Sequence, residues 1–542
     1  NSINNGATEL LEVNAESSQS SLMAKNSDYV LKGDCSQMSD IWNAAILDSY
    51  NNRRSVKIIM EADWVAAKSD NDNVTEFGTG VGFDGGKIRV IAGTNITIDL
   101  NGHNIDRNLF DTTGVDYGYC MKVEGFLNIM DSTYDSNEVY KLLAENRLTQ
   151  TNVDNLPFGK IKGGNNSENG YYAAGVRVSD GGVMNFYSGI ICNNKAIDAA
   201  GLTCMRNGYI NFYDGLIFGN ISTNHGAGIC SGIESTVVVR GGVIANNSSV
   251  LGAGIFSYSL STVDLRNVII TNNSAETLTS STSTVNAAGA GAYISSGCNI
   301  KIGLGTQIYG NLCDNKENNL YLCSTNTLQV ATSYISAANL IAKHITNVGI
   351  SLESPRIFTT DFSVHNSTLS PASFFFSDNE SYSVVKNGDE AELVNATSTL
   401  KTLTWKYNDK TTTNRVMTVT YTGEPFTISA SEGNIFKFSN PAQPSYQVTD
   451  AGVYAFVSTR SYKNTAFTFI VLPKQIDLEW ETNLVYNGVS QSPVAQIKAG
   501  QLIGEDSCNV NVFGSEINVG TGYYAEARSL NNGNYKINPL TK

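Results

Sequence analysis

A repeat of 26 or 27 residues in the middle of the chain restricts its fold more than any other feature. Four glycines with spacings of 26, 27 and 26 residues begin successive units: Gly175, Gly201, Gly228 and Gly254. Nineteen residues after each glycine stands an asparagine: Asn194, Asn220, Asn247 and Asn273. Sixteen residues after each glycine stands an isoleucine: Ile191, Ile217, Ile244 and Ile270. Repeats of this length are typical of solenoids, in which each unit stacks on the next.

Apolar and polar residues alternate within each unit, as in Met184–Tyr187 and Ile210–Tyr213. A period of two indicates short strands with one buried face, and glycines such as Gly189 and Gly215 mark the turns between them. Such a coil buries its apolar face only against another coil. We therefore predict an all-β chain with a right-handed parallel β-helix, in which the four asparagines form a hydrogen-bonded ladder. The alternative is a β-sandwich whose columns match by accident.

The pattern divides the chain into five parts. We expect an N-terminal extension and cap over 1–84, including a short helix at Ser39–Asp48, and then the β-helix over 85–350. A β-rich connector is expected over 351–398. Two small β-sandwich modules follow, over 399–474 and 475–542.

The two modules share a second, longer repeat. Leu403-Thr-Trp405 recurs as Leu478-Glu-Trp480, and Tyr421-Thr-Gly423 recurs as Tyr486-Asn-Gly488. The first module ends in a closing strand at Ala466–Val471, whereas the second stops after Tyr535 without a counterpart. Either the sequence is cut before that strand, or another segment completes the sheet edge. The N-terminal segment Glu9–Val13 is a candidate donor strand between subunits.

Composition excludes several classes of function. The chain has 36 Lys and Arg against 50 Asp and Glu, a net charge of −14, which argues against nucleic acid and anionic membranes as partners. No run of 18 apolar residues is present, so we expect no membrane span. With four histidines and no cysteine pairs at zinc spacing, we expect no metal and no cofactor.

The outward positions of the predicted strands argue against catalysis. Polysaccharide-cleaving enzymes need paired carboxylates or a calcium-binding acidic cluster. One predicted sheet displays a single carboxylate, Asp264, and another sheet displays none, its outward residues being Arg177, Thr203, Cys230, Phe256 and Tyr293. We therefore assign no catalytic residues and expect a non-enzymatic protein.

Two outward columns are candidate contact surfaces. An aromatic and basic stripe suits stacking on sugars or pairing with acidic groups, although ordinary surface pairs give the same pattern: Tyr187, Tyr213, Arg240 and Arg266. An apolar strip is too large to face water: Ile190, Leu216, Val243 and Ile269. We expect either a helix predicted at Glu138–Leu148 or another chain to cover this strip.

The coils resemble the pectin-lyase-like β-helices of bacterial surface adhesins, and in particular polymorphic outer-membrane-protein repeats. The matching motifs are Gly226-Ala-Gly-Ile229, Gly252-Ala-Gly-Ile255 and the Ile-x-x-Asn sequences that end at the four ladder asparagines. The segment Tyr486–Pro493 is similar to the glycine-rich, Ig-like or MBG-like modules of large secreted bacterial proteins. No catalytic motif of β-helix enzymes is matched.

The resemblance implies a secreted or cell-surface, adhesin-like structural protein that binds a glycan or a protein along its shaft. A first alternative is a self-assembling subunit of an extracellular filament or sheath. A second is a polysaccharide lyase or hydrolase.

Overall fold

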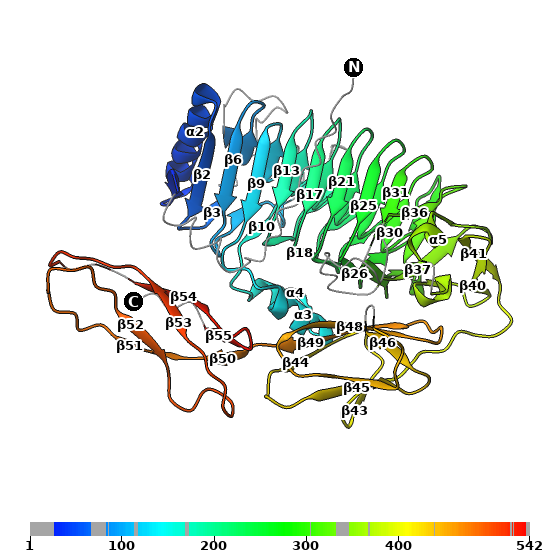
Figure 1. The fold of residues 1–542 in the computed structure, drawn as a ribbon. Helices are drawn as coiled ribbons and strands as arrows, with labels where there is room; N and C mark the ends of the chain where they lie inside the picture. The colour runs from blue at the N-terminus through cyan, green and yellow to red at the C-terminus, as the bar shows by residue number, and fades with distance from the viewer. Residues whose placement is uncertain are drawn as a thin grey trace, which may run out of the picture. The chain divides into compact units, whose positions relative to one another are not determined.

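The computed structural model describes residues 27–66, 83–84, 86–112, 118–167, 173–303, 305–331, 346–366, 369–437, 440–520, 523 and 525–537. The chain divides into two compact units, one formed by Ser27–Leu472 and the other including Pro473–Lys542. The larger unit contains a parallel β-helix together with the first C-terminal module (Figure 1).

Each regular coil of the β-helix contributes one short strand to each of four parallel sheets. Sheet I contains β5 Lys87–Val90, β8 Met121–Val123, β12 Val176–Val178, β16 Leu202–Cys204, β20 Ile229–Ser231, β24 Ile255–Ser257, β30 Ala292–Ile294 and β35 Leu320–Leu322. Sheet II contains β1 Tyr29–Leu31, β2 Ser55–Met60, β6 Asn95–Asp99, β9 Phe126–Met130, β13 Val183–Phe186, β17 Tyr209–Phe212, β21 Thr236–Val239, β25 Thr262–Leu265, β31 Asn299–Ile302, β36 Leu328–Val330 and β38 Thr359–Thr360.

The other two sheets complete the coil. Sheet III contains β3 Trp64–Val65, β7 Ile105–Asp106, β10 Lys160–Lys162, β14 Ile190–Cys192, β18 Leu216–Phe218, β22 Val243–Ala245, β26 Ile269–Thr271 and β32 Gln307–Tyr309. Sheet IV contains β11 Asn165–Asn166, β15 Lys195–Asp198, β19 Ile221–His225, β23 Ser248–Ser249, β27 Ser274–Ala275 and β33 Leu312–Cys313. The hairpin β4 Phe83–Asp84 with β5 and the pair of β33 with β34 Lys316–Glu317 are antiparallel additions.

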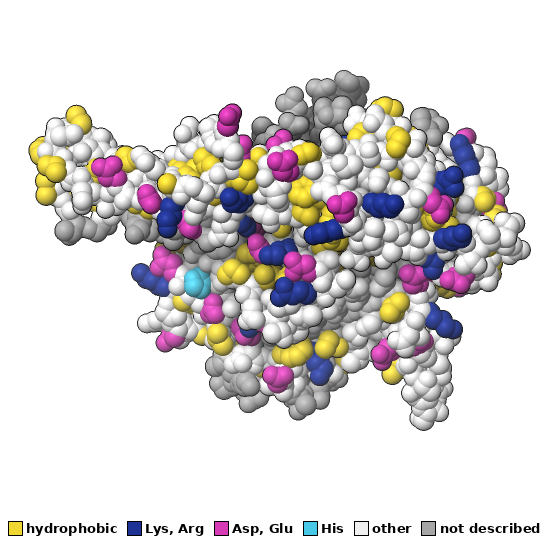
Figure 2. Space-filling view, turned by 90° about the horizontal axis from the view of Figure 1, so that it is seen from below, with side chains coloured by type: hydrophobic (Ala, Val, Ile, Leu, Met, Phe, Trp, Pro, Cys, Tyr) yellow, Lys and Arg dark blue, Asp and Glu magenta, His cyan; other side chains and the backbone are white. Residues whose placement is uncertain are grey.

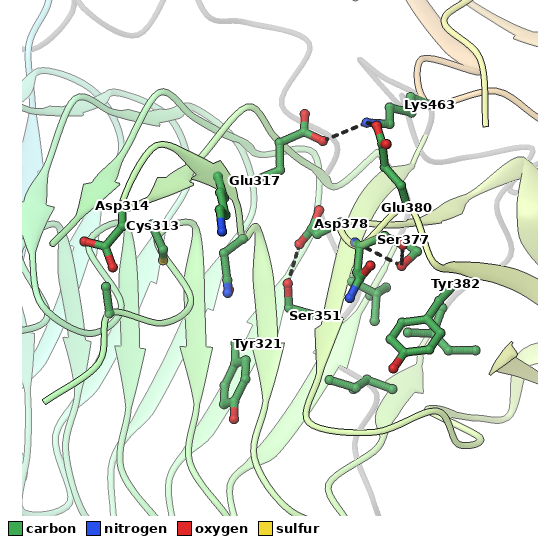
Figure 3. Close-up of a pocket in the computed structure, with 17 residues that line it drawn as sticks. Cys313, Asp314, Glu317, Tyr321, Ser351, Ser377, Asp378, Glu380, Tyr382 and Lys463 are labelled. Atoms are coloured by element: carbon green, nitrogen blue, oxygen red, sulfur yellow. Dashed lines mark hydrogen bonds and ion pairs between the residues drawn. The ribbon is translucent and has the colours of Figure 1, made fainter. Parts of the chain in front are cut away.

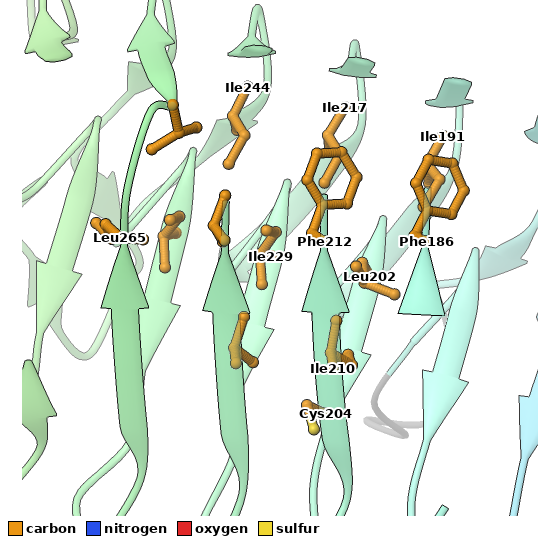
Figure 4. Packing of buried hydrophobic residues seen from close by; sticks show 14 of the residues in the cluster. Phe186, Ile191, Leu202, Cys204, Ile210, Phe212, Ile217, Ile229, Ile244 and Leu265 are labelled. Carbon is orange, nitrogen blue, oxygen red and sulfur yellow. The ribbon is translucent and has the colours of Figure 1, made fainter. Parts of the chain in front are cut away.

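Equivalent residues of successive coils lie directly above one another. Met184 pairs with Ile210, and Ile191 pairs with Ile217. The rings of Phe186 and Phe212 stack with centroids 5.1 Å apart and fill the interior together with the isoleucine column (Figure 4). This registry confirms the predicted parallel β-helix, and it explains the core, because each coil covers the apolar face of its neighbour.

A ladder of six buried asparagines follows the corner between sheets III and IV: Asn194, Asn220, Asn247, Asn273, Asn311 and Asn319. Each side-chain amide donates to the Oδ1 of the next asparagine at 2.9–3.0 Å. The last amide donates to Asp378 Oδ1 at 2.6 Å. The residue before each of the first five has positive φ, which only glycine and asparagine adopt readily: Asn193, Gly219, Asn246, Asn272 and Gly310.

The ends of the β-helix extend beyond the predicted boundaries. Helix α2, Cys35–Asn52, covers the N-terminal end and is longer than the helix expected at Ser39–Asp48. At the other end β37, Asn347–Leu352, pairs with β32 and β35, and β39, Phe375–Ser377, pairs with β37. Parallel pairing therefore continues into the segment expected to be a connector. The remaining elements there are α5 Phe362–His365, η2 Pro371–Ser373 and the hairpin β40 Tyr382–Asn387 with β41 Glu390–Asn395.

The first module is a sandwich of two four-stranded sheets. One sheet contains β43 Lys410–Thr412, β42 Trp405–Tyr407, β45 Phe426–Ala430 and β47 Ser445–Val448. The other contains β44 Val416–Thr420, β49 Ala466–Leu472, β48 Gly452–Ser458 and β46 Ile435–Lys437. Trp405 stacks on Phe467 between the sheets with ring centroids 4.9 Å apart.

The second module has three two-stranded ladders among its described residues. The parallel ladder joins β50 Lys474–Ile476 to β55 Tyr535–Ile537. The antiparallel ladders join β51 Leu478–Glu481 to β52 Val494–Ile497, and β53 Val510–Phe513 to β54 Glu526–Leu530. The donor segment suggested by the sequence, Glu9–Val13, lies outside the described residues. Among the helices that the structure describes, none has the length and apolar character needed to cross a bilayer.

Candidate ligand-binding site

The apolar strip on the outer face of sheet III is buried inside the larger unit. Ile190, Leu216, Val243 and Ile269 are each at most 1% exposed. They pack against α3, Ser136–Ala144, through Val139 and Leu143, and against the first module through Val416 and Ile470. Helix α3 begins two residues before the predicted helix and ends four residues earlier; α4, Gln150–Asp154, follows it. Both a helix and a distant part of the same chain therefore cover the strip.

Arg415 joins the first module to the β-helix at the end of this interface. Its Nε donates to Asn347 Oδ1 at 2.9 Å, and its guanidinium lies 4.4 Å from the centre of the Tyr309 ring. Burial lowers the pKa of Arg415. Lys463 of the module also reaches the β-helix, 3.3 Å from Glu317 and 3.5 Å from Glu380. These contacts place the module at the C-terminal end of the shaft.

The aromatic and basic stripe on sheet II is occupied by contacts between its own residues. Tyr187 and Tyr213 stack with centroids 4.8 Å apart, and the Arg240 guanidinium lies 5.7 Å from the Tyr213 ring centre. Arg266 forms two hydrogen bonds with Asp264, at 3.1 and 2.7 Å. Both faces of the Tyr213 ring are thus covered, and Tyr187 is the most open member at 43% exposed. The Tyr213 ring therefore offers only its edge to a ligand.

A second aromatic file lies on the outer face of sheet I. Phe256, Tyr293 and Tyr321 are in register on β24, β30 and β35, and adjacent ring centroids are 5.3 Å apart. His225 stacks on the other face of Phe256 at 4.5 Å, and its Nδ1 lies 2.8 Å from Asp198 Oδ1. The inner rings of this file are covered on both sides.

The file ends at Tyr321, because the next residue in register is Ser351. A serine is too small to cover an aromatic ring, so the Tyr321 face opposite Tyr293 borders open space. That space is a pocket of about 860 Å³ (Figure 3). The Tyr321 hydroxyl is held by Glu353 at 3.1 Å, and burial, followed by this hydrogen bond, raises the pKa of Tyr321. The ring is therefore fixed in orientation at the pocket wall.

Polar groups from three parts of the chain complete the pocket. Tyr382 and Asn379 come from the segment that enters β40, and Lys463 comes from the first module. Within the described residues, the Tyr382 hydroxyl and the Asn379 side-chain nitrogen have no hydrogen-bond partner, so both are available to a ligand. Asp314 is held by the backbone and hydroxyl of Thr277 at 2.9 and 2.7 Å, and these bonds lower its pKa.

Asp378 at the back of the pocket ends the asparagine ladder. It accepts hydrogen bonds at 2.6 Å from the backbone and side chain of Asn319 and from the Ser351 hydroxyl. Burial is the largest influence on its carboxyl group and raises the pKa of Asp378 to about 6. Two glutamates of the pocket, Glu317 and Glu380, both form ion pairs with Lys463. Each of these carboxylates thus has a structural partner.

The described residues contain no cluster of three or more His, Cys, Asp or Glu side chains suited to a metal ion. All nine cysteines are free thiols, and burial raises the pKa of Cys120, Cys192 and Cys204 to about 12. These thiols are therefore protonated and act as small apolar side chains.

Comparisons with known protein families, with curated proteins and with solved structures find no match to this chain. The pocket was not predicted from the sequence. Phe256 and Tyr293 stood in a recognised outward column, but the residues that close the pocket, Asp378, Tyr382 and Lys463, belong to no repeat.

Proposed function

We propose that this chain is a secreted or cell-surface, adhesin-like binding protein that holds a glycan in the pocket at the C-terminal end of its β-helix. The observation that carries the proposal is the free face of Tyr321 beside Ser351. A rigid aromatic face with polar groups around it is what a pyranose ring needs, because the ring presents apolar C–H groups on one side and hydroxyls at its edge.

The charges of the pocket narrow the class of glycan. Four carboxyl groups line it against two lysines: Asp314, Glu317, Asp378 and Glu380 against Lys316 and Lys463. The whole chain also carries a net charge of −14. An acidic glycan would be repelled, so the ligand we propose is neutral or carries an amino sugar.

The carboxylates of the pocket favour binding over hydrolysis. A glycosidase needs one carboxyl group as acid and a second one free to act as base or nucleophile. Here Asp378 accepts three hydrogen bonds, and Glu317 and Glu380 are paired with Lys463. The likeness of the coils to adhesin repeats supports the same reading.

A glycan array with the labelled full chain tests the proposal. We expect binding to a neutral or amino-sugar glycan and none to uronic acid or sialylated glycans. Tyr321→Ala should weaken the affinity about 30-fold, or about 2 kcal/mol, the usual cost of removing a central tyrosine contact.

Tyr187→Ala is the matched control, because it removes a stacked surface tyrosine from another sheet. It should leave the affinity unchanged. Loss of binding in Tyr187→Ala with retention in Tyr321→Ala would place the site on the stripe and refute the pocket. Release of reducing sugars from a bound polysaccharide would refute a purely binding role.

A further inference from the structure

The pocket lies where the β-helix loses one of its four sheets. In the regular coils, a strand of sheet IV lies between the strands of sheets III and I. After β33 the chain turns back in the antiparallel strand β34, and later β37 pairs with β32 of sheet III at its start and with β35 of sheet I at its end. Within the described residues, sheet IV has no strand beyond this hairpin. The loss of a strand leaves a step on the outside of the shaft, and residues of the hairpin and of β37 line the pocket there.

The hairpin of β33 and β34 forms one wall of the pocket and carries Asp314 in its turn. Asp314 and Asn315 connect the paired residues Cys313 and Lys316, and their φ angles are 46° and 65°. Positive φ at both positions is typical of a two-residue type I′ turn, which aspartate and asparagine adopt more readily than most residues. Figure 3 shows Asp314 and Tyr382 on opposite sides of the pocket.

Asp314 is held in place, yet its carboxylate can accept further hydrogen bonds. Its two oxygens accept from the backbone and the hydroxyl of Thr277, and that hydroxyl accepts from the Ala287 backbone at 3.0 Å. The bond from the Thr277 hydroxyl, followed by the backbone bond, lowers the pKa of Asp314 and keeps it ionised near neutral pH. An ionised carboxylate accepts about four hydrogen bonds, so about two positions remain for a ligand.

The charge of Asp314 is not neutralised by a neighbouring cation. Glu317 and Glu380 both lie close to Lys463, at 3.3 and 3.5 Å, but no ion pair between described residues includes Asp314. Lys316 is near enough to lower the pKa of Asp314 further without pairing with it. Asp314 is also exposed. A cationic group of a ligand can therefore reach this carboxylate.

The size of the pocket calls for more than one sugar ring. Its volume of about 860 Å³ lies near the upper end of the ~300–1,000 Å³ that is typical of sites for drug-sized ligands. A single pyranose is smaller than such a ligand. One ring on Tyr321 therefore leaves the end of the pocket at the hairpin for a further sugar.

A positively charged sugar suits both the pocket and the chain as a whole. On the face drawn in Figure 2, the described Lys and Arg side chains are interspersed with Asp and Glu side chains, and the net charge of −14 attracts a cationic ligand. Hydrogen bonds between an ammonium group and a carboxylate are stronger than those between neutral groups. We propose that Asp314 binds the free amino group of an amino sugar in an oligosaccharide of which another ring stacks on Tyr321. This inference rests on the proposed function and narrows the ligand to glycans with an unacetylated amine.

Two oligosaccharides that differ only at the amine test the inference: a tetramer of glucosamine and its N-acetylated counterpart. Isothermal titration calorimetry of the full chain measures the affinity for each, at a pH below the pKa of the sugar amine. We expect the wild type to bind the glucosamine tetramer about fivefold more tightly, the upper end for an ion pair at an exposed site. The preference should disappear at high salt, because ions screen exposed charges, and at a pH above the pKa of the amine.

Asp314→Asn removes the charge and keeps the turn, because asparagine tolerates positive φ and still accepts from the Thr277 backbone. The affinity for the glucosamine tetramer should fall about fivefold, to that for the acetylated tetramer. Asp409→Asn is the matched control, because Asp409 is an exposed turn residue of another hairpin, that of β42 and β43. It should keep the wild-type preference. Tyr321→Ala should weaken the binding of both tetramers alike.

Several outcomes would overturn the inference and leave the proposed function standing. They are equal binding of the two tetramers by the wild type, an undiminished preference in Asp314→Asn, and no binding of the glucosamine tetramer by a chain that binds other glycans on the array. A chain that binds no glycan at all would refute the proposed function and the inference together.

Discussion

Replacement of Asn247 by alanine tests the asparagine ladder at its centre. The side chain accepts from the backbone and amide nitrogens of Asn220, both at 3.0 Å. It donates to Asn273 Oδ1 at 3.0 Å and to the carbonyls of Ile217 and Ala245, both at 3.1 Å. Asn247 is fully buried, so water cannot replace these five bonds.

The cost follows from the groups that lose their partners. The Asn220 amide side chain keeps a bond to Ile191, and Asn273 Oδ1 keeps the bond from the Asn247 backbone. The Asn220 backbone N–H loses its hydrogen-bond acceptor and is left without another. At about 1 kcal/mol for each lost bond, with an added penalty for an orphaned donor and smaller losses where a second partner remains, we expect Asn247→Ala to lower the free energy of unfolding by about 4 kcal/mol.

Urea unfolding followed by circular dichroism measures this loss, and two variants serve as controls. Asn246→Gly keeps the positive φ of 55° without touching the ladder and should change the free energy by less than about 1 kcal/mol. Asn211→Ala removes one side-chain bond, to Asn185 at 2.9 Å, in place of the five bonds of Asn247, and should cost about 1 kcal/mol. A cost for Asn247→Ala no larger than that for Asn211→Ala would refute the reasoning.

Two further predictions concern the end of the shaft. Burial raises the pKa of Asp378 to about 6, so the stabilising contribution of its protonated form is full below the unfolded pKa of about 3.9 and is lost as the pH rises through 6. Between pH 4 and 7.5, the unfolding free energy of the wild type should therefore fall by about 2–3 kcal/mol relative to that of Asp378→Asn. Parallel pH profiles of the two proteins would contradict this prediction. Arg415→Met should lower the free energy of unfolding by about 2–3 kcal/mol and make the first module sensitive to limited proteolysis, because it removes the hydrogen bonds to Asn347 and Lys463. Lys410→Met, on an exposed strand, should have neither effect. Equal rates of proteolysis in the two variants would contradict this prediction.

The fold could be predicted because equivalent positions in successive repeats have the same surroundings and therefore the same type of residue. Columns such as Ile191, Ile217, Ile244 and Ile270 identify an interior position without any knowledge of its neighbours. The ladder was visible only where its spacing is regular. Asn311 and Asn319 continue it at intervals of 38 and 8 residues. The interval of 38 residues includes the hairpin of β28 Leu278–Thr279 with β29 Thr284–Val285, which lengthens that coil. The interval of 8 residues arises because β34 pairs antiparallel with β33 and so returns the chain to the ladder.

The pocket and the docked module could not be predicted, because their contacts join residues that share no period. Val416 and Ile470 share a buried cluster with Leu216, from which they are 200 and 254 residues distant in the chain, and nothing in the local pattern of either segment identifies the other. Asp378 takes the place of an asparagine at the end of the ladder, outside any repeat. Outward aromatic residues were visible, but whether a ring face is free depends on the size of the next residue in register, here Ser351.

Every assignment of a side chain to the interior, the surface or the pocket depends on the vertical registry of the coils, and an engineered disulfide tests that registry most directly. Asn185 and Asn211 are in register on adjacent strands, and Val238 is in register one strand further on. Adjacent parallel strands lie about 4.8 Å apart, within the Cα range of a disulfide, whereas two strand spacings exceed it. Peptide mapping of the oxidised chain should find the crosslink in Asn185→Cys/Asn211→Cys and none in Asn185→Cys/Val238→Cys. The reverse pattern would contradict the stacked β-helix.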